Sequence, residues 1–371
     1  MASSHPTTAL TAIAGQFAIS GSFLGARPYG SGHINETFAA VFDQGGAEKR
    51  YILQCINPRI FKEPLRVMEN VAQVTRHLHA KLAAAGAPDP ARRALTLVQA
   101  RSGAICHLDD KGLVWRCYLF VEGASSHDIV QHPAQAWEAA KAFGAFQRQL
   151  MDYDGPRLAE TIPLFHHTRH RFEALLRAMA DDPGNRAALA KPELAFALSR
   201  EALADSLLGL KEAGGIPERI THNDTKLNNI LFDDRTGEGL CVLDLDTVMP
   251  GLSLYDFGDM VRTATNPVAE DERDLDRVQV QVAMFEALAR GYLEGTDGAL
   301  LPAERERLVL AGKLITYECG LRFLTDFLER DRYFSISREA QNLDRCRTQF
   351  ALLRSLEACE ERLTAFVQSL G

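Results

Sequence analysis

The feature that most constrains this chain is a polar loop followed by two short apolar runs. The loop occupies residues 220–229 and reads ITHNDTKLNN, and the apolar runs occupy residues 230–232 and 240–243. A polar turn containing glycine separates the two runs, which is the pattern of a β-hairpin. Because a hairpin returns the chain to its starting point, the sequence predicts that Asp244 lies beside Asn229.

Side chains around this hairpin match the needs of phosphoryl transfer. Such a centre needs a carboxylate to receive the proton of the attacking hydroxyl, and an amide and a second carboxylate to hold Mg²⁺ on the nucleotide phosphates. Asp224 is the candidate base, Asn229 and Asp244 are the candidate metal ligands, and Asp246 is a further one. The spacing His222-x-Asp224-x-x-x-x-Asn229 keeps the base and the amide on one tight loop. The alternative is a loop whose polar residues only cap turns.

The same residues resemble the catalytic loop of the aminoglycoside phosphotransferase and choline kinase superfamily, relatives of the protein kinases. Within that superfamily, residues 221–226, 244–251 and 255–259 resemble the N-acetylhexosamine 1-kinases, which phosphorylate the anomeric hydroxyl of GlcNAc and GalNAc. The resemblance is specific over about residues 220 to 262 and weaker along most of the chain. It implies a kinase that uses ATP as co-substrate and Mg²⁺ as cofactor.

The fold that the sequence and the resemblance predict is α+β, with the two lobes of a protein kinase. Residues 1–121 are expected to form an N-terminal nucleotide-binding lobe, a small antiparallel sheet with one helix. Residues 122–371 are expected to form a larger, mainly helical lobe for catalysis and substrate binding. The helical spacing of apolar residues predicts helices over residues 64–86, 133–151, 168–179, 192–211, 276–293, 303–328 and 337–367. Strands are predicted over residues 38–42, 51–56, 95–99, 103–108 and 113–120.

A glycine-rich turn precedes the predicted strand over residues 38–42. Gly30, Ser31 and Gly32 would let backbone N–H groups approach nucleotide phosphates without interference from a Cβ atom. A plain hairpin turn is the alternative, but a position one lobe upstream of Asp224 favours the phosphate-binding interpretation. His33 in the same turn is a candidate contact of the sugar.

The predicted strand over residues 51–56 departs from the superfamily. The resemblance implies a lysine there that steadies the α- and β-phosphates, whereas this chain has Gln54, whose amide brings no charge. Lys226, two residues after Asp224, is expected to compensate by contacting the transferred phosphoryl group. Lys62 is a second candidate for the missing cation.

The remaining assignments follow from the resemblance. Residues Phe120, Val121, Glu122 and Gly123 are expected to form the hinge that contacts adenine, the alternative being a simple linker. His222, Asp256 and Asp259 are expected to support the catalytic loop, so the sequence Asp-Phe-Gly at residues 256–258 is not assigned to magnesium. Arg322 and Tyr333 are expected to bind the sugar, the first through hydrogen bonds and the second through its aromatic face.

Composition limits the other roles. The 41 basic and 49 acidic residues give a net charge of −8, which opposes binding of nucleic acid or of an anionic membrane. The seven cysteines are scattered, and no leader or membrane span is evident, so a cytoplasmic protein is expected. Two alternatives stay open: a kinase of the same fold for an aminoglycoside, choline or homoserine, and a catalytically weak nucleotide-binding regulator, suggested by Gln54. The oligomeric state stays open.

Overall fold

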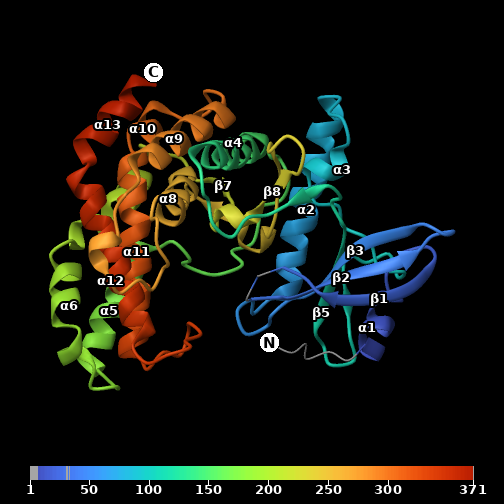
Figure 1. Ribbon diagram of the computed structural model, residues 1–371, viewed down its shortest axis with the longest axis horizontal. Coiled ribbons are helices and arrows are strands. Elements are labelled where there is room, and N and C mark those ends of the chain that lie inside the picture. Colours follow the sequence, from blue (N-terminus) through green and yellow to red (C-terminus); the bar gives the residue numbers. More distant parts are fainter. Residues whose placement is uncertain (1–6, 31, 33, 371) are drawn as a thin grey trace. The chain divides into compact units, whose positions relative to one another are not determined.

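The computed structural model describes residues 7–30, 32 and 34–370, and it divides into two compact units (Figure 1). Unit 1 consists of Met1–Asp128, Gln149–Pro163 and Ile230–Met249. Unit 2 consists of Ile129–Arg148, Leu164–Asn229 and Pro250–Gly371. The lobe boundary predicted after residue 121 stays a prediction.

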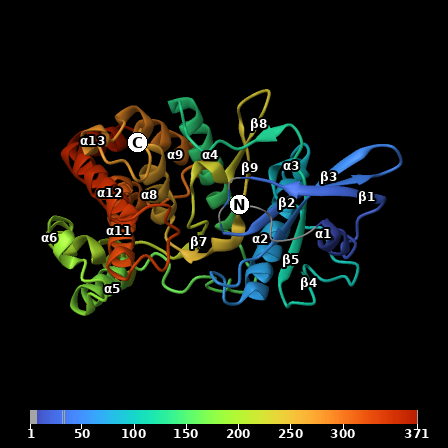
Figure 2. The same ribbon diagram turned by 60° about the horizontal axis from the view of Figure 1, so that its bottom comes forward.

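Unit 1 is built on a five-stranded antiparallel sheet (Figure 2). Its strand order is β1 (Ser22–Pro28), β2 (Glu36–Asp43), β3 (Glu48–Cys55), β5 (Val114–Leu119) and β4 (His107–Leu108). Because side chains alternate along a strand, one face of the sheet collects Phe38, Leu53 and Cys117. Helix α1 (Thr7–Ala14), which the sequence did not predict, packs Leu10 and Ala14 into the same core.

Two helices and a second sheet complete unit 1. Pro64 lies in the first turn of α2 (Pro64–Ala84), where its missing N–H is tolerated, and the short α3 spans Pro90–Arg93. The second sheet has the order β6 (Ala124–Ser125), β8 (Ile230–Asp233) and β9 (Gly239–Val242). Ile230 pairs with Val242, which confirms the predicted hairpin.

Unit 2 is mainly helical, with α11 (Leu308–Leu328) at its centre between α5 (Thr168–Asp181), α8 (Ser253–Ala264) and α12 (Gln341–Ala358). Two glycines let α8 and α11 approach closely: a Cβ at Gly258 would overlap Ala311 O, and one at Gly312 would lie 2.7 Å from Val261 Cγ1. The other helices of the unit are α4 (Pro133–Leu150), α6 (Lys191–Leu198), α7 (Ser206–Glu212), α9 (Val282–Thr296), α10 (Pro302–Arg305) and α13 (Glu360–Ser369). The short strands β7 (Arg219–Thr221) and β10 (Met249–Gly251) pair with each other.

Several predicted elements differ from the structure. The helix predicted over residues 303–328 is interrupted between α10 and α11, and the one predicted over residues 337–367 is divided into α12 and α13. The strand predicted over residues 103–108 is limited to β4. The helix predicted over residues 192–211 is broken into α6, a 3₁₀ turn (Glu201–Asp205) and α7. Ser199 Oγ and Ser206 Oγ each donate to a backbone carbonyl three residues earlier, a local bond that competes with helix continuation. The strand predicted over residues 95–99 is wrong, because the segment makes only an isolated bridge from Leu97 to Tyr118.

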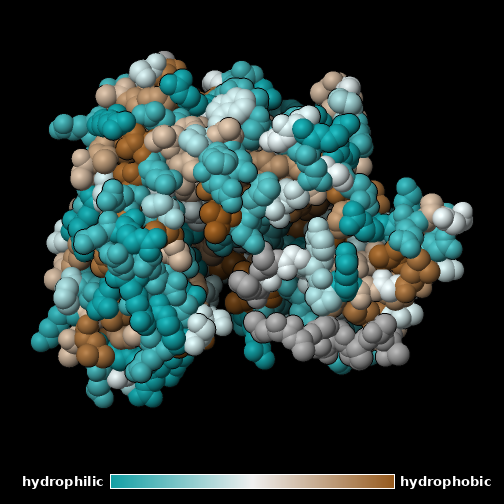
Figure 3. Space-filling view, viewed as in Figure 1, coloured by the Kyte–Doolittle hydropathy of each residue, from teal (hydrophilic) through white to brown (hydrophobic). Residues whose placement is uncertain are grey.

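The visible surface is mostly hydrophilic (Figure 3), and the cysteines, all of which the structure describes, form no disulfide bonds. Hydrophilic side chains dominate the visible face of unit 2, with small hydrophobic patches between them (Figure 3). No helix within the described residues combines the length and the apolar character that crossing a membrane requires. All seven cysteines are free thiols.

Candidate functional site

The predicted catalytic loop of unit 2 runs from the end of β7 to a 3₁₀ turn at Leu227–Asn229. Asn223 has a left-handed backbone, with φ of 65°, and its side chain accepts a hydrogen bond from Thr221 Oγ1 at 2.9 Å. His222 is fully buried and packs edge-on against the rings of Phe143 and Phe146 from α4. The loop is therefore anchored from its first residues.

Asp256, in the first turn of α8, braces the start of this loop. Its two carboxylate oxygens accept the backbone N–H groups of His222, at 3.0 Å, and of Asn223, at 2.7 Å. Its backbone carbonyl accepts a hydrogen bond from Thr225 Oγ1 at 2.5 Å. Burial raises the pKa of Asp256 to about 6, although these N–H groups and the neighbouring imidazoles oppose that rise.

The loop brings Asp224, Lys226 and Asn229 together. Lys226 Nζ lies 2.8 Å from Asp224 Oδ1. Asn229 Nδ2 donates to the backbone carbonyl of Asp224 at 2.8 Å and lies 3.3 Å from Asp224 Oδ2. A carboxylate, a cation and an amide thus occupy one short segment.

Asp259 lies one turn after Asp256 on α8. Its Oδ1 is 2.8 Å from Arg262 Nη2, within a buried ion pair. Its Oδ2 is buried and has no hydrogen-bond partner among the described residues.

Asp246, Gln54 and a residue that the sequence did not single out, Arg116, form a buried group in unit 1. Arg116 Nη1 makes an ion pair with Asp246 Oδ1, and Arg116 Nε donates to Gln54 Oε1 at 2.8 Å. The second oxygen of Asp246 accepts Asn35 Nδ2 at 2.7 Å. Asp244 comes two residues earlier in a left-handed conformation, with φ of 53°.

The glycine turn lies between β1 and β2, and Ser31 and His33 fall outside the described residues. Gly30 has φ of 80°, which favours glycine, and a Cβ at Gly30 or Gly32 would meet no atom within 4 Å. The backbone at Gly30 and Gly32 is therefore open to an approaching ligand.

Two arginines of unit 1 contact residues 120–123, the segment predicted to be the hinge. Arg50 stacks on Phe120, 3.8 Å from the ring centroid, and pairs with Glu122. Arg92 donates to the carbonyls of Glu122, at 3.2 Å, and of Gly123, at 3.1 Å. Val121 is buried beneath them.

Arg322 lies in an aromatic frame in unit 2. Its guanidinium carbon is 5.4 Å from the ring centroid of Phe165, 5.8 Å from that of Tyr333 and 5.4 Å from that of Phe334. Asp326 holds the last two residues in place by accepting their backbone N–H groups at 2.8 and 2.9 Å. The frame thus brings together the two described residues that the sequence assigns to the sugar.

A second arginine, Arg171, adds positive charge near Arg322. Arg171 Nη2 donates to Phe165 O at 2.9 Å, while its Nε is buried without a partner among the described residues. Burial, followed by the charge of Arg322, lowers the pKa of Arg171. Neither arginine forms an ion pair with a described carboxylate.

A buried histidine joins the catalytic loop to α11. His166 Nε2 lies 2.9 Å from the carbonyl oxygen of Asn223, and His166 Nδ1 lies 2.8 Å from Glu318 Oε1. Burial alone would lower the pKa of His166, but the charge and hydrogen bond of Glu318 raise it. Sequence reasoning missed this pair, since no local pattern connects residues 152 positions apart.

The donors available for a metal are oxygen atoms, which suit Mg²⁺. Asn229 directs its Nδ2 toward Asp224, which leaves Oδ1 as an acceptor, and Asp244 offers a carboxylate at the turn after β9. Among the described residues, no group of three or more His, Cys, Asp or Glu side chains is arranged to hold a metal. A Mg²⁺ ion carried on nucleotide phosphates needs only one or two protein carboxylates, and each of these residues offers an oxygen of the kind that such an ion takes.

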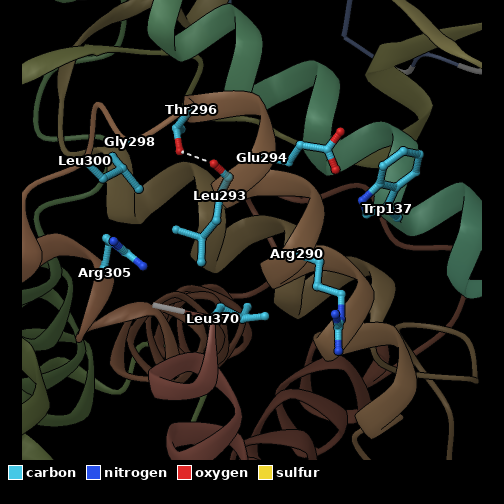
Figure 4. A pocket seen from close by; sticks show the side chains of 9 residues that line it. All are labelled: Trp137, Arg290, Leu293, Glu294, Thr296, Gly298, Leu300, Arg305 and Leu370. Carbon is cyan, nitrogen blue, oxygen red and sulfur yellow. Dashed lines mark hydrogen bonds between the residues drawn. The ribbon is translucent and has the colours of Figure 1, made fainter.

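Unit 2 also contains a cavity of about 600 Å³ formed by α4, α9, α10 and the end of α13. Trp137, Arg290, Glu294 and Arg305 line it, and Thr296 Oγ1 donates to Leu293 O at 3.1 Å beside it (Figure 4). None of the residues predicted for the site lines this cavity.

Several solved structures are similar to this chain. Spectinomycin phosphotransferase, in complex with ADP and spectinomycin, matches with a TM-score of 0.59 at 12% identity, over 96% of this chain and 99% of that one. An aminoglycoside phosphotransferase from Alicyclobacillus acidocaldarius matches with a TM-score of 0.57 at 14% identity, over 100% and 96%. A choline kinase from Cryptosporidium parvum matches with a TM-score of 0.57 at 13% identity, over 93% and 92%.

At these identities the likeness concerns the fold, and it confirms the predicted α+β, protein kinase-like architecture. The model of a sequence family, the phosphotransferase enzyme family, matches residues 25–306. Because that match runs from β1 to the residue after α10 and covers more than half of the chain, the protein belongs to the phosphotransferase enzyme family.

Proposed function

We propose that this protein is an ATP- and Mg²⁺-dependent kinase that phosphorylates the anomeric hydroxyl of an N-acetylhexosamine, GlcNAc or GalNAc. The observation that carries the proposal is the loop on which Asp224, Lys226 and Asn229 contact one another. Membership of the phosphotransferase enzyme family supports phosphoryl transfer. The spectinomycin phosphotransferase of similar fold was crystallised with ADP, which supports ATP as the co-substrate.

Asp224 acts as the base in the proposed reaction. Its carboxylate accepts the proton of the anomeric hydroxyl as that oxygen bonds to the γ-phosphorus, while the bond from the γ-phosphorus to the β–γ bridging oxygen breaks and ADP leaves. Asn229 fixes the position of Asp224 through the hydrogen bond from its Nδ2. Lys226 neutralises negative charge on the transferred phosphoryl group, which a half-exposed ammonium can reach without leaving the loop.

Asn229 and Asp244 are the proposed holders of Mg²⁺. When bound, the ion neutralises the β- and γ-phosphates. Asp246, predicted as a further ligand, pairs instead with Arg116. Asp256 holds the backbone of His222 and Asn223 in the catalytic loop. Asp259, whose carboxylate pairs with Arg262, is proposed to support the loop from α8.

The nucleotide is proposed to lie along unit 1. The open backbone of Gly30 and Gly32, with Ser31 between them, suits the phosphates, and residues 120–123 suit the adenine ring. Tyr118 Oη offers one further polar contact, because it is buried and has no hydrogen-bond partner among the described residues. Gln54 is proposed to reach the nucleotide only indirectly, through Arg116.

The surroundings of Arg322 favour a neutral, oxygen-rich acceptor. The two guanidinium groups make no ion pair with a described carboxylate, and the nearby charge of Glu318, which already pairs with His166, offsets only part of theirs. They therefore repel a cation, whereas their N–H groups suit hydroxyl and acetamido oxygens. Tyr333, which is 54% exposed, offers a ring face for the C–H surface of a sugar. His33 stays a proposed sugar contact, although it lies outside the described residues. Aminoglycosides and choline are cations, and so fit this environment less well.

The test is ADP formation with MgATP and a panel of GlcNAc, GalNAc, glucose, galactose, choline, homoserine and kanamycin. We expect turnover with an N-acetylhexosamine, and ³¹P NMR should then place the phosphate on the anomeric carbon. If only an amine-bearing acceptor is turned over, the proposed sugar substrate is wrong and an aminoglycoside, choline or homoserine takes its place. If no acceptor supports ADP formation while ATP still binds, the result would favour a catalytically weak nucleotide-binding regulator.

Two variants test the assigned roles. Asp224→Asn should lower turnover by roughly 10²- to 10⁴-fold while MgADP binding, measured by calorimetry, is retained. Asp244→Ala should instead weaken Mg²⁺-dependent nucleotide binding. Unchanged turnover in the first variant would remove Asp224 as the base, and unchanged binding in the second would remove Asp244 as a metal ligand.

A further inference from the structure

A row of polar side chains crosses the five-stranded sheet of unit 1. Thr37 on β2, Gln54 on β3 and Arg116 on β5 are register partners, so they share one face of the sheet. Arg116 Nε donates to Gln54 Oε1, and Gln54 Nε2 donates to Thr37 Oγ1, both at 2.8 Å. The neighbours Leu53 and Cys117 point to the opposite, apolar face.

Arg116 ends this row in a fully buried ion pair. Arg116 and Asp246 are each 1% exposed. Burying two charges in a protein interior is expensive, and apolar side chains of similar size commonly stabilise a fold as well or better. Stability alone therefore does not account for this arginine.

The partner of Arg116 belongs to the turn that carries Asp244. This acidic turn, residues 244–248, begins with the left-handed Asp244 and continues as a 3₁₀ turn at Leu245–Thr247. At its end, Asn70 on α2 donates to Val248 O at 3.1 Å. Burial alone would lower the pKa of Arg116, but the charges of Asp246 and Asp244 keep it above its usual value. The guanidinium thus offsets the charge of both carboxylates.

Both oxygens of Asp246 are engaged within unit 1. Oδ1 pairs with Arg116, and Oδ2 accepts Asn35 Nδ2. Asn35 also receives the backbone N–H of Asn57 on its Oδ1 at 3.0 Å, which fixes the end of the glycine turn. One carboxylate therefore ties the glycine turn to the acidic turn.

We propose that Arg116 is a positioning residue for phosphoryl transfer, which holds Asp246 away from the metal and fixes the turn from which Asp244 binds Mg²⁺. The inference rests on the proposed function. It gives Asp246 the role of an anchor, in place of the metal ligand predicted from the sequence. It also explains how a strand with Gln54 keeps a positive charge on this face of the sheet.

The test is binding of Mn²⁺ without nucleotide, followed by electron paramagnetic resonance, together with thermal unfolding. The variants are Arg116→Gln, Asp246→Asn and the double variant R116Q/D246N, and Arg93→Gln, in a surface ion pair of unit 1, is the matched control. R116Q releases Asp246, so a second carboxylate joins Asp244 and Mn²⁺ should bind about 3- to 10-fold more tightly. The double variant and R93Q should bind Mn²⁺ within about twofold of wild type.

Two outcomes with these variants overturn the inference. Weaker Mn²⁺ binding in R116Q/D246N than in wild type would make Asp246 a metal ligand. A lower Tm of R116Q with unchanged Mn²⁺ affinity would make Arg116 merely structural. If R116Q does not fold, the double variant, which leaves no unpaired buried charge, still decides the role of Asp246.

A further variant, Asp244→Asn, separates the inference from the proposed function. Loss of Mn²⁺ affinity in this variant, with no gain in R116Q, overturns the inference alone. Retained Mn²⁺ affinity in Asp244→Asn overturns the proposed metal site and this inference with it.

Discussion

Lys226 Nζ lies 2.8 Å from Asp224 Oδ1, so the proposed base carries its own counter-ion. Burial alone would raise the pKa of Asp224, but the charge and hydrogen bond of Lys226, with smaller effects of His222 and Arg262, lower it. The carboxylate is therefore ionised throughout the neutral range. It is a weak base, which suffices where the transition state demands little proton transfer before the phosphoryl group moves.

Lys226→Met should move the acid limb of the pH dependence of kcat/KM. Removing the ammonium removes the main favourable charge beside Asp224, so the pKa of Asp224 rises and activity is lost at a higher pH than in wild type. The acid limb should therefore lie at a higher pH in Lys226→Met than in wild type. Turnover itself should also fall. Lys226→Arg, which keeps the charge, should leave the limb in place. If the acid limb of Lys226→Met stays where it is in wild type, Lys226 does not control the pKa of the base Asp224.

Asp256→Asn should destabilise the protein and slow turnover together. An amide in place of the carboxylate directs an NH₂ group at one of the two backbone N–H donors, of His222 or Asn223, which loses its acceptor. An unsatisfied buried donor costs roughly 1–3 kcal/mol. Urea unfolding gives the stability change, and Asp297→Asn, an exposed carboxylate of unit 2, is the matched control. Normal turnover in a destabilised Asp256→Asn would show that the loop keeps its geometry without this brace.

The buried pair of His166 and Glu318 should make stability depend on pH. The pKa of His166 is raised above 6.5 in the folded state, so its contribution is complete below that pH and is lost as the pH rises through the folded value. The pKa of Glu318 is lowered from 4.5, against the effect of burial, by His166 and Thr168. Its contribution is complete above about pH 4.5 and is lost as the pH falls. The pair is therefore strongest between about pH 4.5 and 6.5.

Glu318→Gln should cost up to roughly 3 kcal/mol of unfolding free energy near pH 6. The difference from wild type should shrink as the pH rises through the folded pKa of His166, because the imidazole then loses its charge in wild type too. Urea unfolding at a series of pH values measures this. Glu201→Gln, which removes an exposed partner of Arg169, should show no such trend. A difference that stays constant up to pH 9 would argue against an ionised pair.

Much of the fold follows from local sequence patterns. The helices α2, α4 and α5 begin where the periodic apolar spacing predicts them, and the hairpin of β8 and β9 follows from its glycine-bearing turn. Breaks within predicted helices were harder to predict from the sequence. The break between α6 and α7 depends on serine hydroxyls that bond backward to carbonyls, and helical periodicity continues across it.

The candidate site likewise contains residues that local sequence predicts and residues that it does not. The loop residues Asp224, Lys226 and Asn229 are contiguous, so a motif could predict them. Arg116 pairs with a residue 130 positions away, and the only local signal was a charged side chain in an otherwise apolar strand. Such partners depend on tertiary packing, which sequence spacing does not encode.

Gly251→Ala is a test of how closely β10 packs on the catalytic loop. A Cβ at this position would overlap Thr221 Oγ1 and lie 2.8 Å from Asn223 Oδ1, so the side-chain contact between those two residues would have to move. Overpacking of this kind costs roughly 1–3 kcal/mol. Because Asn223 directly precedes Asp224, we expect kcat to fall along with the stability.

Gly209→Ala is the matched control, since Gly209 lies in α7 of the same unit, where a Cβ would meet no atom within 4 Å. There the helix propensity of alanine should leave stability unchanged or raise it by up to about 1 kcal/mol. Urea unfolding and steady-state turnover measure both variants. If Gly251→Ala proved as stable and as active as Gly209→Ala, the loop would have room to relax around the added methyl group. The close approach of Gly251 to Thr221 would then have no part in holding Asp224.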